Sequence, residues 1–129
     1  GTTIRNAWCD QLEVSAGASA RLLFYPGAPP ASPAAADGTG ALATLVLPVD
    51  WMSAAVNGVK SKLGTWQVNA AVAGDIGHFR IKNSTLATCH LQGTVTVTGG
   101  GGDMEVDAIA VLVGQAVTVT NFTLTAPHP

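Results

Sequence analysis

The sequence predicts an all-β domain, an antiparallel β-sandwich or jelly roll of about eight strands with one short N-terminal helix. Short runs of residues alternate between apolar and polar, as expected of half-buried strands. Turn residues separate these runs about every 8 to 12 residues, and one stretch alone has helical spacing. A length of 129 residues corresponds to a single domain covering residues 1–129.

The N-terminal segment, residues 1–17, contains the predicted helix. We expect it to begin at Thr2 or Thr3 and to end near Val14, before Gly17. Four apolar residues at helical spacing form one stripe: Ile4, Ala7, Trp8 and Leu12. The other side is polar and carries Arg5, Asn6, Asp10 and Glu13. Such a helix either docks on its own sheet, which is the commoner arrangement, or reaches a partner.

The remaining chain is expected to form short strands joined by turns. The predicted strands cover residues 20–25, 42–47, 65–72, 76–82, 85–92, 94–98, 103–107, 108–113 and 117–124. The Pro- and Ala-rich segment 28–40 is expected to be a surface loop, because proline removes donors from a sheet. It is either an arm that packs on a neighbouring subunit or a mobile connector. Residues 50–58 are expected to form one helical turn or a loop, and residues 59–64 a turn.

Alternation within the strands predicts which side chains are buried. In residues 76–82, Phe79 and Ile81 are expected inward, and the polar alternate residues outward: His78, Arg80 and Lys82. The apolar run 108–113 predicts a fully buried strand. Four glycines, 99–102, lie between two alternating runs and predict an antiparallel hairpin. In the last strand the apolar residues change parity, which predicts a bulge near Asn121.

Composition limits the classes of function. Hydrophobic residues make up 47% of the chain and charged residues 11%, against about 25% charged in ordinary domains. This favours a surface that lies against other protein; a GC-rich genome, which inflates Ala and Gly, is the alternative.

The net charge of −2 without a basic patch argues against nucleic acid as a partner. No apolar run approaches the ~20 residues of a membrane span, and Gly1 is what removal of an initiator methionine leaves.

No catalytic, cofactor-binding or metal-binding set emerges from the residues. We expect Cys9 and Cys89 to be buried free thiols, a disulfide being the alternative, and His78 and His90 to be surface histidines. Asp103, Glu105 and Asp107 share one strand face, which is expected to be solvated, with calcium binding as the alternative. Trp66 is expected in the core and Trp51 more freely placed. Alternatively, these two residues and Tyr25 form a sugar-binding platform. The chain is therefore predicted not to be an enzyme.

The order of these features resembles small virion proteins of tailed bacteriophages, of the capsid cement or decoration type. The residues that carry the resemblance follow the helix: Ala20–Gly27, Gly38–Leu45, Gly77–Ile81, Gln92–Val95 and Gly114–Val119. The resemblance implies a β-sandwich or jelly roll that lies on the outer capsid surface and clamps subunits of the major capsid protein. It also implies a dimer or trimer on the virion, made in the cytoplasm of the host bacterium.

A clamp of this kind needs contact segments. The expected contact residues are Ile4, Arg5 and Trp8 of the helix, Pro29, Pro30 and Pro33 of the loop, and Trp51. One alternative is a carbohydrate-binding or receptor-binding jelly-roll module of a tail or head fibre, using Trp51. Another is a hydrolase in which Asp103, Glu105 and His90 share a pocket.

Overall fold

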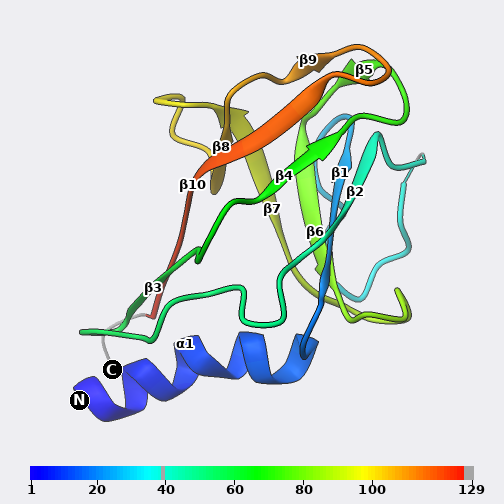
Figure 1. The fold of residues 1–129 in the computed structure, drawn as a ribbon. Helices are drawn as coiled ribbons and strands as arrows, with labels where there is room; N and C mark the ends of the chain where they lie inside the picture. Colours follow the sequence, from blue (N-terminus) through cyan, green and yellow to red (C-terminus); the bar gives the residue numbers. More distant parts are fainter. Residues whose placement is uncertain (39, 127–129) are drawn as a thin grey trace.

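The computed structural model describes residues 1–38 and 40–126, and in this part of the chain one helix lies across the end of a curled mixed β-sheet (Figure 1). The helix is α1 (Thr2–Ala16). The strands are β1 (Arg21–Tyr25), β2 (Ala43–Val46), β3 (Val59–Ser61), β4 (Gln67–Asn69), β5 (Gly74–Asp75), β6 (His78–Lys82), β7 (Cys89–Val97), β8 (Met104–Val106), β9 (Ala110–Val111) and β10 (Ala116–Thr125). The prediction of a β-rich domain with one N-terminal helix is confirmed.

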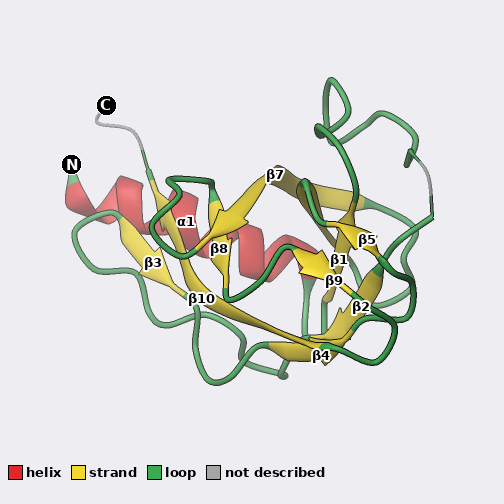
Figure 2. Ribbon diagram, turned by 90° about the horizontal axis from the view of Figure 1, so that it is seen from above, coloured by secondary structure: helices red, strands yellow, loops and turns green. Residues whose placement is uncertain are grey.

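The main sheet has the order β2-β1-β6-β7-β8-β10-β3, with β4 also paired to β10. The sheet curls so that the segment before β2 lies beside the segment after β4. The Leu42 carbonyl accepts hydrogen bonds there from the amides of Ala71 and Val72, at 2.8 and 3.2 Å. Seen from above, the strands surround the core, with α1 beneath them (Figure 2). The small β5–β9 sheet lies at the end opposite the helix (Figure 1).

The expected antiparallel jelly-roll sandwich is not what the strands form. One pair in the main sheet, β7 and β8, is parallel, with Val95 opposite Met104 and Val97 opposite Val106. The prediction of an antiparallel hairpin at this point is therefore wrong.

The glycine run explains the parallel pairing, because it folds back over its own strand. Added Cβ atoms would lie 2.7 Å from Thr96 Cβ at Gly100 and 2.9 Å from Thr96 Cγ2 at Gly102. The Gly102 amide donates to Thr96 Oγ1 at 3.0 Å. Only glycine lets the chain pass so close to Thr96. Because the chain folds back here, β8 begins opposite Val95 and not beyond the end of β7.

Several strand boundaries also differ from the prediction. Of residues 108–113 only Ala110–Val111 is strand, and Leu112 and Val113 are each 70% exposed, because this segment pairs only with the two-residue β5 at the end of the sheet. A strand, β3, replaces the turn expected within 59–64. The bulge in the last strand is confirmed, since the β8–β10 register shifts between Val119 and Asn121.

The core is built on four aromatic rings in a chain. Ring centroids are 6.1 Å apart for Trp51 and Trp66, 5.7 Å for Trp66 and Phe122, and 5.6 Å for Phe79 and Phe122. Trp66 is in the core as predicted. Trp51 is also fully buried, and its Nε1 donates to the Gly17 carbonyl at 3.1 Å, so the expectation that it is freely placed is wrong. It is buried because α1 covers the loop that carries it.

The contact between Gly77 and Gly27 provides a test of the packing. A Cβ at residue 77 would lie 2.2 Å from the Gly27 carbonyl oxygen, which is backbone and has little freedom to move. Gly77→Ala is expected to lower the free energy of unfolding by about 1–3 kcal/mol, measured by chemical denaturation. Gly38→Ala is the matched control, because nothing lies within 4 Å of its Cβ position. Equal stability of the two variants would contradict this packing.

Candidate functional site

Helix α1 is held to the sheet by its polar side. The Glu13 carboxylate accepts hydrogen bonds from the amides of Trp51 and Met52 at 3.1 and 3.0 Å, and pairs with Lys60 Nζ at 3.0 Å. Lys60, which is 4% exposed, also pairs with Asp10 at 2.7 Å. A buried ammonium needs such partners, because removing it from water unpaired would cost several kcal/mol.

Two further residues of the same side complete the attachment. Asn6 Oδ1 accepts the Gly58 amide at 2.7 Å, and the buried Cys9 thiol donates to the Gly58 carbonyl at 3.2 Å. The polar side of the helix thus faces the protein. The reason is that the loop from Trp51 to Lys60 presents backbone amides and a cation, which only polar side chains can satisfy.

The charged groups at this attachment shift one another's pKa values. Burial acts to raise the pKa of Glu13, but hydrogen bonds from Lys60 and the Met52 amide outweigh it, and the pKa lies below its ordinary value of 4.5. Burial acts to lower the pKa of Lys60, but its bonds to Asp10 and Glu13 hold it above 10.5. The hydrogen bond that Asp50 shares with Glu13 raises the pKa of Asp50. At neutral pH the Glu13–Lys60 contact is therefore an ion pair.

The opposite side of α1 faces outward and carries the predicted apolar stripe. Ile4 is 52% exposed and Trp8 49%, while Leu12 is half-buried against the core. Although the Asp10 side chain that pairs with Lys60 is 49% exposed, the residues of the helix that are exposed as a whole are all uncharged: Thr2, Thr3, Ile4, Ala7, Trp8, Gln11, Val14 and Ser15. We call this surface the outer helix face. Arg5, the third contact residue predicted in the helix, is half-buried and donates to the Ala126 carbonyl at 3.3 Å.

The Pro-rich loop is docked on its own sheet. Arg80 Nη2 donates to the carbonyls of Pro33 and Ala35 at 2.7 and 2.9 Å, and Asp37 pairs with both Arg80 and Lys82. Gln92 Nε2 donates to the Pro30 carbonyl at 2.6 Å. The loop is therefore not an arm extended away from the domain. Pro29 and Pro30 are half-buried and Pro33 is exposed.

Because this loop covers the polar side of β6, the prediction that this side is exposed is wrong. The buried residues include His78, Arg80 and Lys82, all expected outward. Alternation assigned their direction correctly, opposite to Phe79 and Ile81, but the loop covers that side. Burial acts to raise the pKa of Asp37, but the bonds from Lys82 and Arg80 outweigh it and hold the pKa below 3.8.

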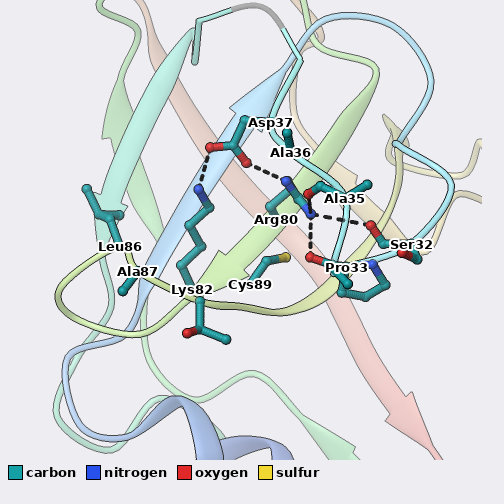
Figure 3. Close-up of a pocket in the computed structure, with 12 residues that line it drawn as sticks. Ser32, Pro33, Ala35, Ala36, Asp37, Arg80, Lys82, Leu86, Ala87 and Cys89 are labelled. Atoms are coloured by element: carbon teal, nitrogen blue, oxygen red, sulfur yellow. Dashed lines mark hydrogen bonds and ion pairs between the residues drawn. The ribbon is translucent and has the colours of Figure 1, made fainter.

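A cavity of about 700 Å³ opens between this loop and the turn after β6 (Figure 3). Arg80, Lys82 and Asp37 contribute its charged groups, and Cys89 lies at its wall. Cys9 and Cys89 are both free thiols, as predicted; both were expected to be buried, but only Cys9 is, and Cys89 is half-buried.

The three carboxylates of residues 103–107 support the backbone. Asp103 accepts the Thr94 amide at 3.0 Å, Glu105 the Gly101 amide at 3.0 Å, and Asp107 the Thr118 amide at 2.9 Å. The Gly101 hydrogen bond lowers the pKa of Glu105 below 4.5. Within residues 1–38 and 40–126, no three His, Cys, Asp or Glu side chains lie close enough together to hold a metal ion.

The structure places the residues of the alternative hydrolase site apart and buries those of the alternative sugar-binding platform. Asp103 lines a cavity with Phe79 and Phe122, whereas His90 lines another beside Trp8. Trp51, Trp66 and Tyr25 are buried, so they form no sugar-binding platform at the surface, the alternative considered for them.

Comparison with known proteins adds no relative. No protein-family model matches the chain, and neither the curated proteins nor the solved structures give a match. None of the helices in the described residues has the length and apolar character needed to cross a membrane.

Removing the charge of Glu13 tests the attachment of α1. Glu13→Gln is expected to lower the free energy of unfolding by about 2–3 kcal/mol, because Lys60 loses one of its two carboxylate partners. Chemical denaturation measures the change. Gln11→Ala, on the exposed side of the same helix, is the control and is expected to stay within about 0.5 kcal/mol of the unchanged chain.

The same contact predicts a dependence of stability on pH. Because folding lowers the pKa of Glu13, its contribution is fully present above pH 4.5 and is lost as the pH falls through the folded-state value. The stability difference between the unchanged chain and Glu13→Gln should therefore narrow from pH 7 to pH 3, which denaturation curves at each pH would measure. A constant difference would contradict this account.

Proposed function

We propose that this chain is a non-enzymatic structural protein of a bacteriophage virion, of the capsid cement or decoration type. It binds the outer capsid surface and stabilises contacts between subunits of the major capsid protein. The sequence resemblance suggests the class of protein. The structural observation that carries the proposal is the uncharged outer helix face, with Ile4 and Trp8 about half exposed.

The outer helix face has the composition of a protein-binding surface. Interface cores are depleted of charged residues, and tryptophan is enriched among the residues that contribute most to binding. Arg5, Asp10 and Glu13, the charged residues of α1, all bond to the domain instead. Because these bonds fix the helix before any partner arrives, binding requires little additional ordering.

The low content of charged residues, 11%, agrees with a chain that works in contact with other protein. A protein that binds assembled subunits but not separated ones stabilises the assembly by mass action. We further propose that it acts as a dimer or trimer on the capsid, where several modest contacts add by avidity. Under this proposal it is made in the host bacterial cytoplasm and resides in the virion.

Point substitutions on the outer helix face test the proposal. The double variant Ile4→Ser, Trp8→Ser is expected to weaken binding to capsids by about 30-fold or more, since truncating a central anchor costs about 2 kcal/mol. Co-sedimentation with capsids measures occupancy. Leu112→Ser, a similarly exposed apolar position at the opposite end, is the control. Deleting residues 1–17 is a poorer test, because it also removes the partners of Lys60.

Unchanged capsid occupancy in a folded double variant would overturn the assignment of this surface. Absence of binding by the unchanged chain to any capsid would overturn the proposed function. Co-sedimentation with tails or fibres instead of capsids would favour the receptor-binding alternative.

A further inference from the structure

The cavity beneath the Pro-rich loop carries an excess of positive charge. Its charged lining consists of Arg80, Lys82 and Asp37, that is two positive charges and one negative, or +1. The rest of the lining is small or aliphatic and includes Pro33, Ala35, Leu86 and Ala87. The structural pairing of Asp37 therefore leaves one cationic charge uncompensated at the cavity.

The two cations also retain unused hydrogen-bond donors. Arg80 is 1% exposed, and its Nε is buried without a partner. The Lys82 ammonium has three donors, and Asp37 is its only hydrogen-bond acceptor among the described residues. The free donors of the Lys82 ammonium lie in the cavity lining, so a carboxylate from outside would pair with a cation there and accept hydrogen bonds from it.

We propose that this cavity is a binding site for a carboxylate group on a short aliphatic stem. A single excess positive charge suits a monoanion, and the ammonium and guanidinium groups are the usual carboxylate partners. The walls formed by Pro33, Leu86 and Ala87 suit methylene groups. A volume of about 700 Å³ is sufficient for an acidic side chain with adjoining backbone. This inference stands independently of the proposed virion function.

The site is organised before a ligand binds. The Pro33 and Ala35 carbonyls fix the Arg80 guanidinium, and β6 carries Arg80 and Lys82 on the same side of one strand (Figure 3). Asp37, with 37% of its side chain exposed, forms the only negative part of the lining. Binding is therefore expected to strengthen when Asp37 is neutralised and to weaken when Lys82 is.

The Arg80 Nε–Hε resonance provides a readout by NMR, because Arg80 lines the cavity and a carboxylate bound there changes the electric field at this buried group. The full chain would be titrated with three probes: sodium acetate, a blocked peptide with one glutamate, and a peptide whose only carboxylate is its C-terminus. Sodium chloride at equal ionic strength is the reference. The probes separate a small acid, an acidic side chain and a chain terminus as sources of the carboxylate.

A saturable shift with at least one carboxylate probe, absent with chloride, supports the site. Lys82→Met should then weaken binding by about tenfold, through loss of a charge-assisted hydrogen bond. Asp37→Asn should tighten it, and Lys62→Met, which changes an ammonium outside the cavity, should leave it unchanged.

Three results would overturn the proposal: no saturable shift with any probe, an equal shift with chloride, or equal affinity in a folded Lys82→Met variant. If Lys82→Met does not fold, Asp37→Asn decides the matter, because a structural role alone predicts no gain in affinity. Weaker binding by folded Asp37→Asn would also overturn it.

Discussion

A charged group that leaves water must find partners, and in this chain three cations leave water at two places where the sheet provides none. Lys60 is buried under α1, and Arg80 and Lys82 are buried under the Pro-rich loop. Each is satisfied by a segment distant in sequence: Asp10 and Glu13 for Lys60, Asp37 and loop carbonyls for Arg80. The only helix and the longest loop of the described chain are thus anchored by cations of the β-domain, and Leu12 and Ala16 of the helix add apolar contacts with the core.

The local pattern of the sequence was sufficient to predict much of the sheet. Alternation identified β6 and the direction of its side chains, and the parity change in the last strand located the irregularity between Val119 and Asn121. Both are properties of residues adjacent in the chain, where a period of two directly sets geometry. The parallel β7–β8 pair was missed because glycines at 99–102 fit a hairpin equally well, and the choice depends on their contact with Thr96.

The candidate surfaces could not be predicted in the same way. Alternation shows that Phe79 and Arg80 point to opposite sides of a strand, but not whether a loop covers the second side. Helical spacing grouped Ile4 with Trp8 correctly, but it left open whether that stripe docks on the sheet or reaches a partner. The deciding information was that Glu13 meets Lys60 and the amides of Trp51 and Met52, contacts that join residues about forty positions apart and have no signature in a single sequence.

The two cation sites also account for the character of the outer surface. The chain has 14 charged residues, six basic and eight acidic, and those of α1 are directed inward to Lys60 and the nearby backbone. Because a helix has two sides, directing its few charges inward leaves Ile4 and Trp8 outside. An exposed tryptophan on a fixed helix is unfavourable for an isolated domain but favourable for one that binds protein. The internal pairing of scarce charges and the apolar outer helix face are therefore two consequences of one arrangement.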